Sequence, residues 1–187
     1  AEPVTRRLQH LQVLLTAHRC ADATELEHQR RMLELVNAPS DPFSRRNFEP
    51  GHFTASSFVV HPSCDALLLI FHSKLRRWLQ PGGHVDPTDI DIVSAARREL
   101  EEEVGIRELL PRAGLLDLDI HRIPPLRRSN GTEPGHEHFD LRLLFHAENE
   151  DFSPGSDALD ARWVRFDDVN VAESDESVLR AVRKLRA

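Results

Sequence analysis

The sequence predicts an α/β fold in which helices pack on a mixed β-sheet, preceded by an N-terminal helical hairpin. Helical and strand patterns are mixed along the chain, and neighbouring strand patterns favour hairpins over an all-parallel wound sheet. The 187 residues suit one domain with a small appendage. We expect residues 1–41 to form the N-terminal helical segment and residues 42–187 to form the main domain.

The first forty residues are expected to form two helices. Apolar side chains recur at helical spacing in residues 5–18, at Leu8, Leu11, Leu14 and Leu15. The next stretch, "DATELEHQRRMLELV", offers a capping box at Asp22 with Glu25, or at Thr24 with Glu27. The apolar faces of both helices must be buried. Docking on the same chain is favoured over docking on a second subunit, so both a monomer and a homodimer stay open.

From Phe53 the pattern changes to that of β-strands. Two predicted strands, "FTASSFVV" and "ALLLIF", are separated by the turn "HPSCD". After a central helix come "GLLDLDIHRI", "HFDLRLLFHA", a further strand "ARWVRF" and an amphipathic closing helix "DESVLRAVRKLRA". The segment "PPLRRSNGTEPGHE" is rich in proline, glycine and arginine, and we expect it to be a loop.

Composition and charge narrow the class of protein. No apolar run approaches the ~20 residues of a membrane span, and the first residues lack the apolar region of a signal peptide, so a cytoplasmic protein without membrane contact is expected. Cys20 and Cys64 have no metal-like spacing and are expected to be reduced thiols. The net charge of −7 argues against a nucleic-acid partner. An anionic ligand would therefore need a divalent cation.

The stretch "PGGHVDPTDIDIVSAARRELEEEVGI" gathers four glutamates after a glycine turn. It predicts a helix from about Asp89 to Val104 that ends at Gly105. On a helical wheel, Glu99, Glu102 and Glu103 share a face beside the core, whereas Glu101 points elsewhere. Such a face is often merely solvated, but three carboxylates with this spacing also suit a hard divalent cation such as Mg²⁺.

The neighbouring residues strengthen the metal hypothesis. Arg98 can pair with Glu102 at i+4 and hold it in place. The glycine turn lets the backbone approach the carboxylates, so that a carbonyl becomes a further ligand. The candidate metal ligands are Gly83, Glu99, Glu102 and Glu103. The candidate catalytic residues are Glu102, Glu103 and Arg98.

This stretch resembles the Nudix box, the signature of the Nudix hydrolase family. The matching positions are Gly83, Asp89, Arg98, Glu99, Leu100, Glu102, Glu103, Gly105 and Ile106. The sequence departs from the family pattern in having Asp89 for a usual glutamate and one extra residue before Arg98. We expect the junction between loop and helix to be remodelled and the metal face to be kept. The resemblance covers roughly residues 53–186.

The resemblance implies a sheet sandwiched between helices and a Mg²⁺- or Mn²⁺-dependent pyrophosphohydrolase. Its small-molecule substrate would be a nucleoside diphosphate derivative, with ADP-ribose or a nucleotide sugar the best expectation. The departures in the box keep an alternative open, a Nudix-fold nucleotide sensor without catalysis. An isoprenoid diphosphate isomerase on the same fold would need a catalytic cysteine, and Cys64 lies in a turn unsuited to that role.

A second group of polar residues lies on the two strands after the box. Strand alternation places Asp117, Asp119 and His121 on one face, and does the same for His138, Asp140 and Arg142. If the strands pair, this patch could receive phosphates, although a polar outer face of a half-buried sheet is an equal alternative. His136 and His138 alone make no convincing metal site. The candidate substrate-binding residues are His121, His138, Asp140, Arg142, Arg127 and Arg128.

Many Nudix enzymes use one more acid outside the box, as a ligand or a general base. The candidates in this chain are Glu148, Glu150, Asp157 and Asp160. Ala158 stands where similar proteins often have a glutamate, so the resemblance does not single out one of the four.

Overall fold

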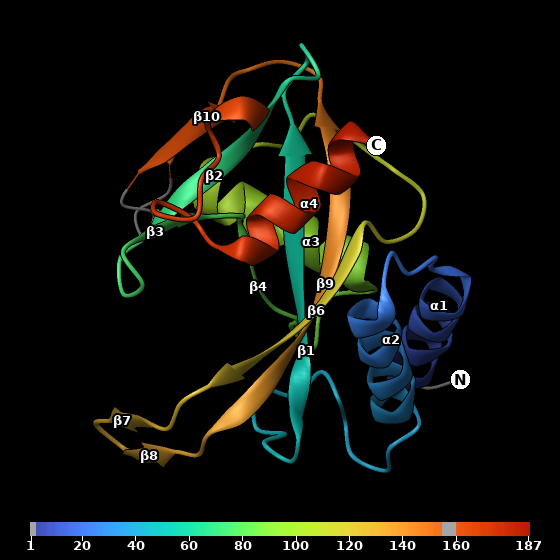
Figure 1. Cartoon of the computed structure of the whole chain (residues 1–187). Helices are drawn as coiled ribbons and strands as arrows, with labels where there is room; N and C mark the ends of the chain where they lie inside the picture. Colours follow the sequence, from blue (N-terminus) through green and yellow to red (C-terminus); the bar gives the residue numbers. More distant parts are fainter. Residues whose placement is uncertain (1–2, 155–159) are drawn as a thin grey trace.

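The computed structural model describes residues 3–154 and 160–187, and its helices lie around one large sheet (Figure 1). Two helices form the N-terminal hairpin, and two more pack on the sheet. Their bounds are α1 Pro3–Ala17, α2 Ala23–Val36, α3 Ile92–Val104 and α4 Glu176–Arg186, with a short 3₁₀ turn at Phe166–Asp168. None of the described helices is long and apolar enough to cross a membrane.

The sheet is mixed, as the sequence predicts. Its main strand order is β10-β2-β1-β9-β5, with β3, β4 and β6 paired to β2, β1 and β9 respectively. β1 and β9 run parallel over ten residue pairs, whereas their other pairings are antiparallel. The bounds are β1 Gly51–Val60, β2 Ala66–His72, β3 Arg77–Leu79, β4 Gly82–His84, β5 Leu109–Pro111, β6 Asp117–Ile123, β9 His136–Ala147 and β10 Ala161–Arg165.

The two faces of the sheet carry different helices (Figure 1). In β1, Phe53, Ala55 and Val59 share a core with α3, whereas Phe58 and Val60 share a second core with α4. This alternation is what a strand buried on both sides requires. The arrangement is the sandwich of helix, sheet and helix that the resemblance implied, and the alternation decides which side chains can meet.

The N-terminal hairpin packs on its own chain. Apolar residues of both helices belong to the core beneath α3, namely Leu11, Leu15, Met32, Leu35 and Val36. Asp22 caps α2 by accepting from the Glu25 N–H at 2.8 Å. The Nη1 atom of the buried Arg7 donates to the carbonyl oxygens of Asp86 at 2.9 Å and Asp89 at 3.2 Å. The hairpin therefore also supports the loop before α3, while a domain boundary at residue 41 stays a prediction.

Two local expectations were wrong. The central helix begins at Ile92 rather than near Asp89, because Asp91 caps it and forms a capping box with Ser94. The segment expected to be a loop contains a small hairpin, β7 Leu126–Arg128 and β8 Gly131–Glu133, which projects from the main sheet (Figure 1). The C-terminal end of α3 agrees with expectation, since Gly105 adopts φ 64° and its N–H bonds the Glu101 carbonyl.

Candidate active site

The glutamate face of α3 lies against strand β4. A Cβ atom added to Gly83 would lie 2.6 Å from the carboxylate carbon of Glu99, which is closer than real Cβ contacts come. Glycine therefore leaves room for this carboxylate, and a larger residue would require the Glu99 side chain to move. The role of the Gly83 carbonyl as a metal ligand stays a prediction.

The surroundings of Glu103 disfavour the charged form of its carboxylate. Burial and the nearby charges of Glu99 and Glu102 raise its pKa to about 8, against a lowering contribution from a backbone hydrogen bond with Gly82. Its Oε2 atom is buried and has no hydrogen-bond partner within residues 3–154 and 160–187. Burial also raises the pKa of Glu99. A bound cation would remove both the repulsion and the unpaired acceptor, so these residues fit a hard divalent metal.

Arg98 holds the carboxylates in position. Its Nη1 donates to Glu99 Oε1 at 2.9 Å and to Glu102 Oε2 at 3.2 Å, the latter being the predicted i+4 pair. Its Nε and Nη2 donate to the two carboxylate oxygens of Asp89 at 3.0 and 2.9 Å. Its Nη2 also donates to the His84 carbonyl at 3.0 Å. These acceptors raise the pKa of the guanidinium above its ordinary value, with Asp89 contributing most.

Asp89, in the loop before α3, holds both Arg98 and its own loop in place. Asp89 is buried, and besides Arg98 it accepts from the Asp86 N–H at 2.8 Å. The shorter acid thus still reaches the arginine in bidentate geometry. Glu101 is exposed and pairs with Arg107, on the other side of the helix from this group. Sequence reasoning found the glutamates and Arg98, but it did not foresee the contact between Arg98 and Asp89.

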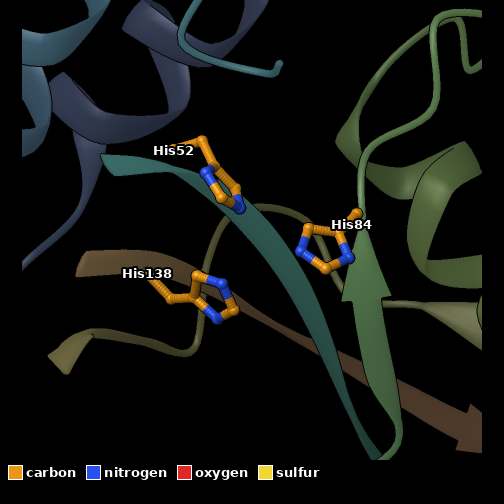
Figure 2. A group of neighbouring side chains, drawn as sticks. All are labelled: His52, His84 and His138. Carbon is orange, nitrogen blue, oxygen red and sulfur yellow. The ribbon is translucent and has the colours of Figure 1, made fainter. Parts of the chain in front are cut away.

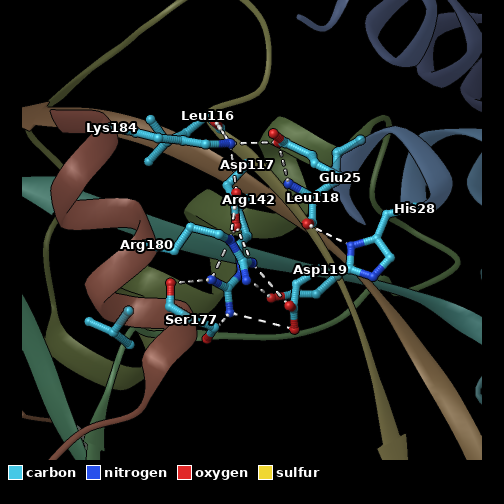
Figure 3. A network of polar contacts seen from close by, with 12 residues as sticks. Glu25, His28, Leu116, Asp117, Leu118, Asp119, Arg142, Ser177, Arg180 and Lys184 are labelled. Carbon is cyan, nitrogen blue, oxygen red and sulfur yellow. Dashed lines mark hydrogen bonds and ion pairs between the residues drawn. The ribbon is translucent and has the colours of Figure 1, made fainter. Parts of the chain in front are cut away.

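The predicted polar strands do pair, and most of their polar groups are buried. Asp117, Asp119 and His121 lie opposite Arg142, Asp140 and His138 in the β6–β9 ladder. Arg142 is 2% exposed and pairs with Asp140 at 3.1 Å and Asp117 at 3.3 Å (Figure 3). Its Nη1 and Nη2 donate to the Ser177 carbonyl and hydroxyl at 3.0 and 2.8 Å.

This buried network also includes side chains of α2 and α4, which lie far apart in the sequence. Arg180 of α4 binds Asp117 at 2.6 Å and Asp119 at 3.0 Å. Lys184 binds Asp117 at 2.7 Å and Glu25 of α2 at 2.5 Å (Figure 3). Side chains of α4, β6, β9 and α2 thus satisfy one another. The predicted contact of Asp140 and Arg142 with substrate stays a prediction, and in the structure their polar atoms face protein groups.

The other substrate-binding candidates lie nearer solvent. His121 is exposed and bonds Asp119 at 3.0 Å, whereas His138 is partly buried beside it, with ring centroids 5.5 Å apart. Arg127 and Arg128 are exposed on the projecting hairpin, where Arg128 pairs with Glu133 at 2.6 Å. Among the candidate extra acids, Glu148, Glu150 and Asp160 are exposed, while Asp157 and Ala158 lie outside the described residues.

A group of histidines was only partly recognised from the sequence. His52, His84 and His138 converge from β1, β4 and β9 (Figure 2), and His136 stacks on His52 with centroids 5.0 Å apart. Burial and the neighbouring histidines lower the pKa of His138 to about 2, and burial with Arg45 and other neighbours lowers that of His84 to about 4. Strand alternation in "GHFTASS" could have placed His52 on a face, but not beside β9.

The mixed sheet between helices, with the box glutamates on α3 and Glu99 against β4, is the arrangement that the Nudix resemblance implied. A family model of the NUDIX domain matches residues 52–184, and the chain belongs to this family. Nudix hydrolases generally need a divalent metal and act on small nucleotide substrates. The match begins at the first strand of the sheet and leaves the two N-terminal helices outside it.

Solved structures share the fold. A NUDIX-family hydrolase from Clostridium perfringens is 24% identical, with a TM-score of 0.50 over 72% of this chain and 96% of that chain. A MutT NUDIX hydrolase from Burkholderia pseudomallei is 22% identical, with a TM-score of 0.52 over 71% of this chain and 95% of that chain. The comparison with curated protein sequences found no match.

Proposed function

We propose that this Nudix hydrolase cleaves the pyrophosphate linkage of a nucleoside diphosphate derivative, with ADP-ribose or a nucleotide sugar as its substrate. The observation that carries the proposal is the glutamate face of α3, where the Glu99 carboxylate lies against Gly83 and Glu103 has a buried oxygen without a partner in the described part of the chain. In this proposal the Gly83 carbonyl, Glu99, Glu102 and Glu103 hold Mg²⁺ or Mn²⁺. Oxygen donors of this kind suit both ions.

The bound ion would neutralise charge on the phosphate oxygens and lower the pKa of a coordinated water. The protein side chains orient the carboxylates that would hold the ion. Arg98 fixes the orientation of Glu99 and Glu102, and Asp89 fixes Arg98 through two hydrogen bonds. In the overall reaction the water oxygen bonds to one phosphorus, and the bridging oxygen leaves with the other phosphate. Arg98 is therefore a positioning residue, because it acts through the carboxylates.

Substrate binding is proposed for the exposed and half-exposed candidates. His121 offers its ring and Arg127 and Arg128 offer charge to phosphates, whereas the ring of His138 lies against those of His52 and His84. Asp140 and Arg142 would act indirectly in this proposal, since Arg142 lies 3.8 Å from Asp119, the partner of His121. A cleft of about 240 Å³ beside the box loop adds Arg45 and Arg46 to the positive groups near the site.

A substrate panel tests the proposal. The protein is incubated with ADP-ribose, nucleotide sugars, NADH, dNTPs, coenzyme A and capped or triphosphorylated RNA, each with Mg²⁺ and with Mn²⁺, and the phosphate products are measured. We expect turnover of ADP-ribose or a nucleotide sugar that depends on the metal and is lost in Glu103→Gln. Turnover confined to another member of the panel would contradict the proposed substrate. Calorimetric binding without product from any member would instead favour a nucleotide sensor.

A further inference from the structure

The histidine group lies on the opposite face of the sheet from the carboxylates. In β4, Gly83 is the register partner of Ala55 and His84 that of Thr54. Ala55 belongs to the core beneath α3, whereas Thr54 donates to Asp140 in the network beneath α4. The alternation of the strand therefore directs Gly83 to the glutamates and the His84 side chain to the other face. Any ligand of this group would be separate from the metal proposed on α3.

Three imidazoles meet on this face because of strand register. His52 of β1 is the direct partner of His138 in the parallel ladder with β9, and His84 stands beside them on β4. The ring centroids are 4.9 Å apart for His52 and His138, 5.1 Å for His52 and His84, and 5.3 Å for His84 and His138. One ring nitrogen from each lies within 4.8 Å of the other two (Figure 2).

This spacing is close to that of a coordination sphere. Bonds of about 2.0–2.1 Å from Zn²⁺ to nitrogen place tetrahedral ligand atoms roughly 3.4 Å apart. The ring nitrogens would therefore need to close by at most about 1.4 Å, which side-chain rotations supply for the partly exposed His84 and His138. Their donor atoms come from three different strands, so backbone hydrogen bonds keep the group assembled.

His52 is oriented as a metal ligand would be. It is 1% exposed, and its Nδ1 lies 3.2 Å from the Asn47 carbonyl, so Nδ1–H donates and Nε2 carries the lone pair. This Nε2 is buried and finds no hydrogen-bond partner in the part of the chain that the structure describes. An unpaired buried acceptor costs about 1–3 kcal/mol. Metal-bound histidines characteristically donate their second nitrogen to a carbonyl or carboxylate.

A neighbouring histidine repeats the pattern. His136 is 1% exposed, its Nδ1 lies 2.8 Å from the Pro134 carbonyl, and its buried Nε2 also has no partner among the described residues. Its ring centroid is 5.2 Å from that of His138. His136 is thus a second buried imidazole beside the group, although its ring nitrogens are not among the three that converge. Arg45 opposes binding, since its Nη2 lies 2.9 Å from His84 Nδ1, but this arginine is exposed and can turn into solvent.

We propose that His52, His84 and His138 form a site for a first-row transition metal such as Zn²⁺, separate from the Mg²⁺ or Mn²⁺ site on α3. Neutral imidazoles suit zinc, copper, nickel and cobalt, whereas Mg²⁺ prefers oxygen ligands. Three protein ligands leave one tetrahedral position for water or for a phosphate oxygen.

The other cluster of ligand types in the described chain lacks these properties. His18, Cys20 and Glu25 also bring their donor atoms together. The Glu25 carboxylate, however, already binds His18 at 2.7 Å and Lys184 at 2.5 Å. A cation there would have to displace an ammonium group. The histidine group has unpaired acceptors instead, and it is therefore the better site.

The experiment is a titration of the full-length Glu103→Gln protein with Zn²⁺ by calorimetry and with Co²⁺ by visible absorption. The Glu103→Gln substitution removes one ligand of the proposed carboxylate site and leaves the histidines unchanged. We expect one saturable site per chain, with the visible bands of nitrogen-ligated Co²⁺, in the presence of millimolar Mg²⁺. His138→Ala should weaken binding by about 100-fold or more. The matched control, His146→Ala on the same strand, should bind like the parent.

Circular dichroism shows whether each variant is folded, and thermal unfolding shows whether Zn²⁺ stabilises it. Zn²⁺ should raise the Tm of the parent and of His146→Ala, but not that of His138→Ala. Should His138→Ala fail to fold, His84→Ala removes a ligand at a partly exposed position and takes its place. The absence of saturable binding in the parent, or unchanged binding in a folded His138→Ala or His84→Ala variant, would overturn the proposal. Because the substrate panel measures Mg²⁺-dependent turnover separately, failure of one proposal does not hide the other.

Discussion

The α3 face and the α4 face of the sheet both bury carboxylates, but they neutralise them differently. On the α3 face, Glu99 and Glu102 share Arg98 as a partner, whereas Glu103 retains a buried oxygen with no partner in the described chain. On the α4 face the acids and bases nearly balance. The acids there are Glu25, Asp117, Asp119 and Asp140, and the bases are Arg142, Arg180 and Lys184.

The pKa values show the same contrast. That of Glu103 is raised to about 8, mainly by burial and by other carboxylates. That of Glu25 is lowered to about 2, because hydrogen bonds from His18, Ala21 and Lys184 outweigh its burial. A fold can complete the second arrangement by itself, whereas we propose that a bound cation completes the first. Carboxylates without a charge partner thus distinguish the proposed metal site on α3 from the α4 network, which stabilises the fold.

Loss of Glu103 tests the contrast through activity and should have the largest effect. Glu103→Gln keeps the shape of the side chain but removes the charge that would hold the cation. We expect kcat/KM to fall by about 1,000-fold or more, which corresponds to roughly 4 kcal/mol of transition-state stabilisation. Steady-state kinetics on the substrate found in the panel provide the measurement. Glu101→Gln, on the exposed side of the helix, is the control and should change kcat/KM less than about twofold.

Loss of one acid from the balanced network should act on stability instead. Asp117 is fully buried and contacts Arg142, Arg180 and Lys184. Asp117→Asn leaves these cations short of one partner, so the free energy of unfolding should fall by about 3–5 kcal/mol. Urea unfolding followed by circular dichroism measures this change. A midpoint within error of the parent would show that the network contributes little.

The acid dependence of stability tests Glu25. Its pKa of about 2 in the folded protein lies below the ordinary value of 4.5, so the ionised form is favoured by folding. This contribution, roughly 3 kcal/mol, is fully present above pH 4.5 and disappears as the pH falls toward 2. Glu25→Gln should flatten the fall in unfolding free energy over that range. Urea unfolding from about pH 6 to pH 2.5 checks this, with the exposed Glu34→Gln as control.

The smallest expected effect concerns the stability of the metal-free protein. Because Glu103 is buried beside other carboxylates, Glu103→Gln should relieve repulsion and raise the Tm measured in EDTA by roughly 2–4 °C. The same change should abolish the rise in Tm that Mg²⁺ or Mn²⁺ produces in the parent. A lower Tm in EDTA would mean that the charge of Glu103 is already compensated within the protein. That result would remove the contrast between the two faces.

Local patterns were the predictable part of the structure. The shared face of Glu99, Glu102 and Glu103 and the pair formed by Arg98 and Glu102 follow from helical spacing alone. Strand alternation likewise placed Asp119, Asp140 and their neighbours on one face, and the strands do pair. These features need no knowledge of how distant segments pack.

The missed features depend on distant segments. His52 meets His138 only because β1 and β9 pair in parallel register, which no local pattern encodes. The burial of Arg142 depends on Ser177, which lies 35 residues away on α4. Asp89 reaches Arg98 because the helix starts at Ile92 and leaves the acid in the loop. Sequence reasoning named Asp89, His138 and Arg142, but it missed His52 and did not give the partners of Asp89 or His138.

The contact between Glu25 and Lys184 has a consequence for how the chain folds. The two residues are 159 positions apart, and both also join the network around Asp117. During synthesis α1 and α2 emerge before α4, so the charge of Glu25 is fully matched only after α4 has left the ribosome. Contacts of such long sequence separation slow folding. The N-terminal helices should therefore acquire their full protection from hydrogen exchange late, together with α4.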